Sequence, residues 1–151
     1  QPRPRVAPGM ALDPALLALF SEIRGGTLIT LKRDGRPQSS LVGHAFDPET
    51  REVRISVTDS RAKTRNLRRD PRLSYQVARP DLSAYAVAEG TARLSPVAAE
   101  PDDATVEDLV AYYRDMSGEH PDWDDYRRAM VAEGRLLLRF TVDHVYGWSR
   151  R

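Results

Sequence analysis

The chain has 151 residues, of which 40% are hydrophobic and 30% charged, and its formal net charge at pH 7 is +1. This length predicts one domain, and the near-neutral charge argues against a general nucleic-acid-binding protein, which needs a broad basic face. No run approaches the roughly 20 apolar residues of a membrane-spanning helix, and the lack of cysteine excludes disulfides and thiolate chemistry.

The sequence begins with a proline-rich stretch, QPRPRVAPG. This stretch has neither a hydrophobic period nor the apolar core of a signal peptide. We therefore expect a disordered N-terminal extension over residues 1–12, one domain over residues 13–151, and a cytoplasmic location.

A short helix is predicted next, beginning at Asp13 and Pro14. Asp is a favoured N-cap, and Pro at the first helical position has no amide hydrogen to lose. Gly25 and Gly26 indicate the end of this helix. Its hydrophobic face is formed by Leu16, Leu17, Leu19, Phe20 and Ile23.

Six or seven β-strands account for most of the remaining chain. The first three should form a meander, in which Asp34 and Gly35 turn the first hairpin. A bulge is expected at Gly90 in the fifth strand. The strands are predicted at residues 27–31, 38–46, 52–58, 72–78, 83–94, 135–142 and 144–148.

Between the strands predicted at residues 83–94 and 135–142, hydrophobic residues recur at the spacing of a helix. One helix should follow Pro101, and a second should run from about Pro121 to Glu133 and end at Gly134. Their aromatic residues are expected to pack against the sheet: Tyr112, Tyr113, Trp123 and Tyr126. Together these elements predict a mainly β (α+β) fold, a small antiparallel barrel with short helices at its ends.

The stretch DSRAKTRNLRRDP, residues 59–71, concentrates positive charge at a predicted helix. Ser60 or Asp59 should be the N-cap, so that the helix begins at Arg61. Arg61 and Lys63 then lie in the first turn, where the helix dipole disfavours cations unless an anion binds there. An anion at this end would accept hydrogen bonds from backbone amides and from both side chains.

Other cations of this helix need no ligand. Arg68 and Arg69 lie in the last turn, where the dipole favours cations. Arg65 and Arg69 should share a face that contacts water, whereas Asn66 should share the face of Lys63. From the charge pattern alone, a solvated helix and an anion site remain equally open.

Polar residues on the neighbouring strands favour the anion site. They could line one groove that leads to the helix start: Gln38, Ser39, Ser40, Ser56 and Thr58. Such a groove is an elongated slot with hydrogen-bonding walls and a cationic end, which suits a phosphorylated planar cofactor.

Three segments of the chain together resemble a known family: GRPQSSLVGHAFDP, VRISVTDSRAKTRNLRRDPRLSYQV and SAYAVAEGTARL. They are similar to the flavin and deazaflavin oxidoreductases of the split β-barrel superfamily, which are pyridoxamine 5'-phosphate oxidase-like. The resemblance is closest to the actinobacterial branch that uses coenzyme F420, an 8-hydroxy-5-deazaflavin, and it extends from Asp13 to Trp148. It implies an FMN-binding split barrel-like fold and a homodimer with cofactor sites between the subunits.

The resemblance also implies three groups of cofactor contacts. The cofactor phosphate and the start of the polyglutamyl tail would be held by Arg61, Ala62, Lys63 and Thr64, with Asn66 in support. The deazaflavin ring would lie beside Gln38, Ser39, Ser40, Leu41, Ser56 and Val57. Tyr85 would approach from the other subunit.

The implied activity is hydride transfer from the reduced deazaflavin to an unsaturated small-molecule acceptor. This chemistry belongs to the cofactor and demands no protein nucleophile, so no catalytic residue is assigned. An FMN-dependent pyridoxamine 5'-phosphate oxidase-like enzyme and a non-enzymatic F420 carrier remain alternatives. No metal site is expected, because His44, His120 and His144 are far apart, and His44 is either buried and hydrogen-bonded or directed into the groove.

Overall fold

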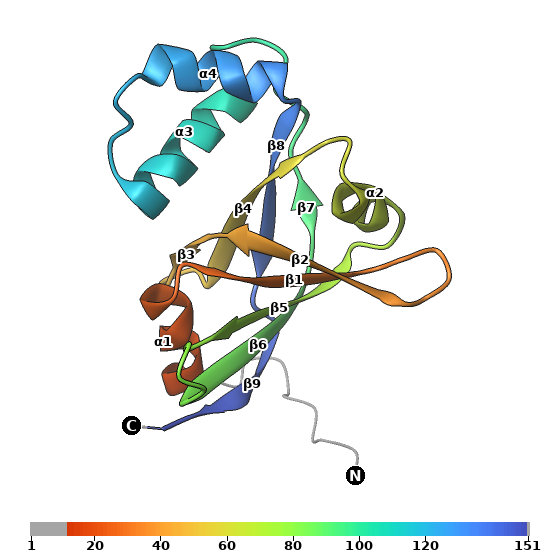
Figure 1. Ribbon diagram of the computed structural model, residues 1–151, viewed down its shortest axis with the longest axis vertical. Coiled ribbons are helices and arrows are strands. Elements are labelled where there is room, and N and C mark those ends of the chain that lie inside the picture. Colours follow the sequence, from red (N-terminus) through yellow and green to blue (C-terminus); the bar gives the residue numbers. More distant parts are fainter. Residues whose placement is uncertain (1–11, 151) are drawn as a thin grey trace.

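Two antiparallel sheets form a split barrel that does not close (Figure 1). The computed structural model describes residues 12–150. The five-stranded sheet has the order β2-β1-β5-β6-β9, and the four-stranded sheet has the order β3-β4-β8-β7. The strands are β1 (Gly25–Leu31), β2 (Pro37–Gly43), β3 (Ala45–Asp47), β4 (Glu52–Thr58), β5 (Arg72–Ala78), β6 (Ala84–Thr91), β7 (Arg93–Leu94), β8 (Arg135–Thr141) and β9 (His144–Ser149). The predicted mainly β split barrel is confirmed.

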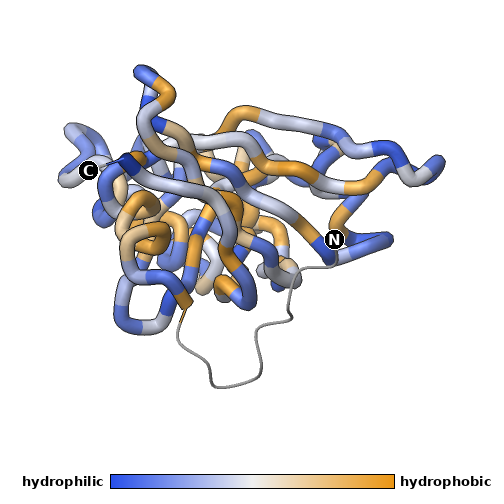
Figure 2. The backbone as a smooth tube through the Cα atoms, turned by 90° about the horizontal axis from the view of Figure 1, so that it is seen from below, coloured by the Kyte–Doolittle hydropathy of each residue, from blue (hydrophilic) through white to orange (hydrophobic). Residues whose placement is uncertain are grey.

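The hydrophobic core lies between the sheets, and strand β4 illustrates how the sequence builds it. Val53, Ile55 and Val57 alternate along this strand and are at most 1% exposed. Because successive side chains of a strand point to opposite faces, the polar residues between them lie on the other side of the sheet. Figure 2 shows hydrophobic segments gathered in the interior and hydrophilic loops at the periphery. Of the expected extension, only Leu12 lies within the described residues, and it is buried in this core.

Within residues 12–150, four helices pack around the two sheets: α1 (Pro14–Glu22), α2 (Ala62–Arg69), α3 (Ala104–Ser117) and α4 (Trp123–Ala132). Asp13 caps α1 as predicted, since its carboxylate accepts a hydrogen bond from the amide of Ala15 at 2.9 Å. Helices α3 and α4 form a hairpin at one end of the molecule, where α3 packs on β4 and β8 (Figure 1). No helix of residues 12–150 is long and apolar enough to cross a membrane.

The predicted meander is only partly correct, because its two hairpins form in different sheets. Strands β1 and β2 pair as expected, but the predicted strand over residues 38–46 breaks at His44, and β3 then pairs with β4 in the other sheet. Strand β4 pairs with β8 and not with β2. The break follows from the burial of His44, which is 1% exposed and lies at the corner where the chain passes between the sheets. With a similar break after Thr91, the described residues contain nine strands where six or seven were predicted.

Two glycine predictions are also corrected. Helix α1 ends at Glu22, and Gly25 and Gly26 open strand β1. A Cβ atom at Gly26 would lie 2.2 Å from the carbonyl oxygen of Gln76, so this glycine permits the close approach of β5. Gly90 is not a bulge, because it pairs with Leu73 in a continuous register.

Candidate functional site

The cation-rich helix α2 begins at Ala62, one residue later than predicted. Its N-cap is Arg61, which makes no side-chain capping hydrogen bond, so the predicted caps Ser60 and Asp59 are wrong. The Asp59 carboxylate instead pairs with Arg68 at 2.5 Å. The first turn of α2 therefore lacks the carboxylate or hydroxyl that usually satisfies such amides, which leaves them available to an external anion.

A cavity of about 450 Å³ lies beside this helix start. Strand β4 contributes Ser56 and Thr58 to its lining, and three cations share it: Arg61, Lys63 and Arg135. Arg135 reaches the same place because it begins strand β8 directly opposite Thr58 in the β4–β8 register. The cavity therefore combines a helix N-terminus, two hydroxyl groups and three positive side chains.

The charge in this cavity is only partly balanced by the described residues. No acidic side chain of the described chain lines it, and neither Arg61 nor Lys63 forms an ion pair within residues 12–150. Burial, followed by the neighbouring charges of Arg61 and Arg135, lowers the pKa of Lys63. Arg135 has one counter-charge, Glu133, at 3.0 Å. A bound anion would relieve the repulsion among these cations and would favour the protonated form of Lys63. The arrangement therefore fits a phosphate or a phosphodiester.

The structure brings four of the predicted site residues together around this cavity: Leu41, Ser56, Arg61 and Lys63. Thr64 is fully buried, and its hydroxyl donates to the carbonyl of Thr58 at 2.8 Å, which ties α2 to β4. The side chain of Val57 belongs to the core, whereas Ala62 and Ser39 are exposed and Ser40 is half-buried.

Asn66 lies apart from the cavity, where it organises the neighbouring hairpin. Its buried amide donates to Thr30 at 3.1 Å and to Gln38 at 2.8 Å, and its oxygen accepts from Arg69 at 2.9 Å. The Arg69 guanidinium also donates to the carbonyl of Leu31 at 3.0 Å. Arg69 is exposed, as expected, but its guanidinium also makes these two hydrogen bonds, and Asn66 is buried under the hairpin and does not line the cavity with Lys63. Both residues attach α2 to the β1–β2 hairpin.

Sequence reasoning missed two parts of the cavity. Arg135 carries no local signal, because only the pairing of β4 with β8 brings it to α2. The helix hairpin supplies a further wall of aromatic and thioether side chains: Tyr112, Tyr113, Met116, Tyr126 and Met130. The tyrosines do pack the helices as expected, but they also face this cavity.

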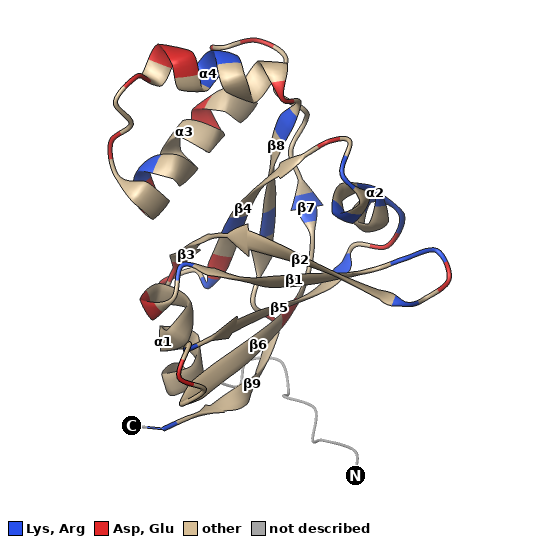
Figure 3. Ribbon diagram, viewed as in Figure 1, with Lys and Arg blue, Asp and Glu red and all other residues tan. Residues whose placement is uncertain are grey.

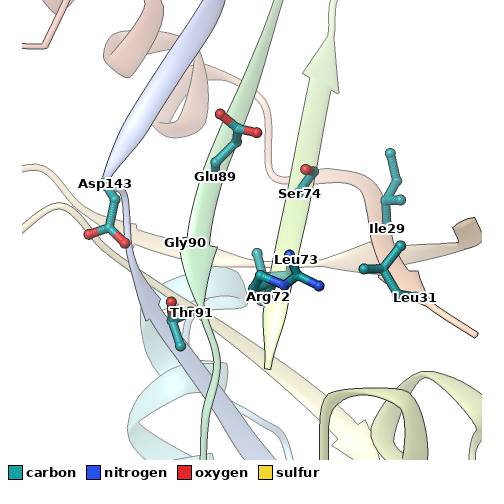
Figure 4. Close-up of a pocket in the computed structure, with 9 residues that line it drawn as sticks. All are labelled: Ile29, Leu31, Arg72, Leu73, Ser74, Glu89, Gly90, Thr91 and Asp143. Atoms are coloured by element: carbon teal, nitrogen blue, oxygen red, sulfur yellow. The ribbon is translucent and has the colours of Figure 1, made fainter. Parts of the chain in front are cut away.

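The outer face of the five-stranded sheet carries a second hollow and much exposed hydrophobic surface. A cavity of about 380 Å³ lies over β1, β5 and β6 (Figure 4), and its lining includes Ile29, Leu31 and Ser74. The large hydrophobic residues that are most exposed are Leu41 (86%), Leu82 (79%) and Trp148 (46%). Tyr85 pairs with Trp148 across β6 and β9 on this sheet, so it is remote from the cationic cavity of its own chain.

The family model described as pyridoxamine 5'-phosphate oxidase matches residues 12–149. The chain belongs to this family. The expected relationship to the split-barrel flavin and deazaflavin oxidoreductases is thereby confirmed, and family membership supports an oxidoreductase or flavin-binding role.

Three solved structures illustrate the shared fold. A conserved hypothetical protein of Mycobacterium tuberculosis has a TM-score of 0.72 and 21% identity, with 98% of this chain and 91% of that chain covered. An F420 reductase has a TM-score of 0.62 and 21% identity, with 89% and 98% covered. A heme storage protein of Vibrio cholerae has a TM-score of 0.64 and 16% identity, with 91% and 94% covered.

In this member of the pyridoxamine 5'-phosphate oxidase family, His44 is a core residue. It is 1% exposed, its Nε2 donates to the carbonyl of Phe20 at 2.8 Å, and its Nδ1 accepts from the Tyr75 hydroxyl at 2.5 Å. Burial lowers the pKa of His44, although its hydrogen bond to Phe20 opposes this effect. Of the two expectations for His44, the buried and hydrogen-bonded one is confirmed.

The lowered pKa of His44 predicts that acid destabilises the fold. Below the ordinary histidine value of 6.5, the unfolded chain binds a proton that the folded chain does not bind until the pH reaches the lowered pKa. The free energy of unfolding should therefore fall as the pH decreases through this window. Urea unfolding at several pH values measures the slope. A His44→Gln variant, which cannot titrate, should show a smaller slope, and an unchanged slope would contradict the assignment.

Proposed function

We propose that this protein is an F420-dependent oxidoreductase that reduces an unsaturated small-molecule acceptor. The observation that carries the proposal is the cavity at the start of α2, where Arg61, Lys63 and Arg135 converge without an acidic lining residue among those described. Membership of the pyridoxamine 5'-phosphate oxidase family and similarity in fold to an F420 reductase support it. When bound and reduced, coenzyme F420 supplies a hydride to such an acceptor.

The residues of the cavity fit the anionic part of this cofactor. Lys63 and Arg61 would hold the phosphodiester together with the free amides of the first turn of α2, and Arg135 would add charge from β8. Ser56 on β4 would extend the polar wall along the ring. Gln38 would be held in place by its hydrogen bond from Asn66.

Charge beyond the cavity favours the deazaflavin over FMN. FMN ends at its phosphate, whereas coenzyme F420 continues from its phosphodiester into lactate and a run of glutamates. Figure 3 shows Lys and Arg along α2 and on the β1–β2 hairpin. Arg36 on this hairpin is exposed, and we propose that it attracts the tail.

We expect coenzyme F420 to bind more tightly than FMN in dilute buffer, with a difference that narrows in high salt. Exposed tail contacts are screened by salt, whereas the partly buried phosphate contact is screened less. Isothermal titration with both cofactors at low and high ionic strength measures this difference. Tight FMN binding, with oxidation of pyridoxine phosphate coupled to reduction of oxygen to hydrogen peroxide, would overturn the proposal and favour the FMN-dependent alternative.

Turnover distinguishes an enzyme from a carrier. We expect steady-state oxidation of reduced F420 with a quinone or an enone, in air and without hydrogen peroxide, because a deazaflavin reacts sluggishly with oxygen. Tight F420 binding with no turnover of any acceptor would favour the non-enzymatic carrier.

The exposed sheet face supports a homodimer as the functional unit. Exposed hydrophobic side chains that gather on one face of a sheet are typical of an interface. If a second copy covers this face around a two-fold axis, Tyr85 of the partner subunit could reach the cofactor that its own chain does not approach.

We expect light scattering to give twice the 17.0 kDa chain mass at micromolar concentration. Trp148→Glu should shift the protein toward the monomer, because it buries a carboxylate in the hydrophobic interface. Arg128→Glu, an exposed change on α4, is the control and should leave the dimer intact. A monomeric wild type that still binds the cofactor tightly would contradict a shared site.

A further inference from the structure

The aromatic wall of the cationic cavity is not explained by cofactor binding. It comes entirely from the α3–α4 hairpin, whereas the residues proposed to hold the cofactor lie on β2, β4, α2 and β8. Rings and thioethers provide a flat and adaptable surface for a planar ligand. This wall is therefore available to the second reactant.

The hydroxyl groups of its three tyrosines differ in their partners. The Tyr112 hydroxyl donates to the carbonyl of Gly43 at 3.3 Å, and the Tyr126 hydroxyl donates to the carbonyl of Leu109 at 2.9 Å. The Tyr113 hydroxyl donates to no protein group within residues 12–150. A phenol on a cavity wall without an internal partner is ready to bond to a ligand.

The ring of Tyr113 is nevertheless firmly held. Its centroid lies 5.1 Å from His120, 5.7 Å from Trp123 and 5.1 Å from Tyr126, each in an edge-to-face or tilted arrangement. Tyr113 is half-buried on α3, and these contacts hold its ring in place before a ligand binds. Such preorganisation reduces the entropy lost on binding.

We propose that Tyr113 is the residue that selects and positions the acceptor, and that the acceptor is a planar conjugated carbonyl compound. The ligand would stack on the aromatic and thioether wall, and its carbonyl oxygen would accept a hydrogen bond from the Tyr113 hydroxyl. This inference rests on the proposed function, because it assigns the acceptor of the same reaction.

The test is equilibrium dialysis of menadione, a planar quinone, against the 151-residue chain saturated with oxidised F420. Both reactants are then oxidised, so binding is measured without turnover. Tyr113→Phe removes one hydrogen bond and should weaken menadione binding about 3- to 10-fold. Tyr75→Phe removes the same atom from a core tyrosine that does not line the cavity, and it should leave the affinity unchanged.

Thermal unfolding of the two variants excludes a merely structural role for Tyr113. Tyr75→Phe loses its buried hydrogen bond to His44 and should lower the melting temperature, whereas Tyr113→Phe should not. Tyr113→Phe is therefore expected to weaken menadione binding without lowering the melting temperature, and the control variant is expected to do the reverse.

Two results would overturn the inference: equal menadione affinity in wild type and Tyr113→Phe, or displacement of menadione by F420. The second would mean that the wall holds the cofactor itself. Retention of F420 in the same dialysis tests the proposed function separately. A chain that binds menadione through Tyr113 but fails to retain F420 would refute the cofactor and leave the role of Tyr113 standing.

Discussion

Replacing Lys63 with glutamate is expected to weaken F420 binding about 100-fold, because one charge-assisted hydrogen bond is lost and a carboxylate is placed beside the phosphodiester. Lys63 is half-buried at the first turn of α2, and burial and neighbouring cations lower its pKa. The substitution should not unfold the protein, since Lys63 has no ion-pair partner among the described residues and a glutamate there would attract Arg61 and Arg135. Titration calorimetry with F420, supported by urea unfolding, measures both effects.

Arg65→Glu is the matched control for this experiment. Arg65 lies on the same helix, is exposed, and does not line the cavity, so its reversal should cost less than about threefold in affinity. Arg69→Glu is unsuitable, because Arg69 holds Asn66 and the carbonyl of Leu31. Similar losses from Lys63→Glu and Arg65→Glu would reveal a diffuse basic face and refute a defined anion site.

Gly147→Ala should be the most damaging single-methyl substitution in the barrel, with a loss of at least about 3 kcal/mol in the free energy of unfolding. Gly147 has a φ of 145°, and a Cβ atom there would lie 2.2 Å from the carbonyl oxygen of Tyr85 and 3.0 Å from the Cα of Ala86. Both atoms belong to the backbone of β6, the partner of β9, so the clash cannot be relieved by rotating a side chain. Urea unfolding followed by circular dichroism gives the change.

Gly118→Ala separates the two causes of this loss, which are the positive φ and the clash of the added Cβ atom with the backbone. Gly118 also has a positive φ, 83°, but a Cβ atom there would meet nothing within 4 Å. Its substitution should cost only the conformational term of about 1–2 kcal/mol. Equal losses at the two positions would mean that the contact between β9 and β6 is not as close as the structure places it.

Local patterns in the sequence determined most of the elements and the centre of the candidate site. Alternation in β4 identified its buried face, and Asp13 with Pro14 marked the start of α1, because these signals act between near neighbours in the chain. The gathering of cations at the start of α2 could also be predicted from the sequence. Cations in the first turn of a helix are unfavourable by themselves, so Arg61 and Lys63 were candidates for an anion site, although the charge pattern alone left a solvated helix equally open.

Only the tertiary structure decided how these elements combine. The break at His44 sends β3 to the other sheet, and the pairing of β4 with β8 places Arg135 beside Lys63. The tertiary structure also gives the exposed Arg69 a hydrogen bond to the carbonyl of Leu31, which the sequence did not predict. These outcomes depend on contacts between segments far apart in the chain. Such contacts are stabilised by burial and strand pairing in the assembled barrel, so short patterns in the sequence do not predict them.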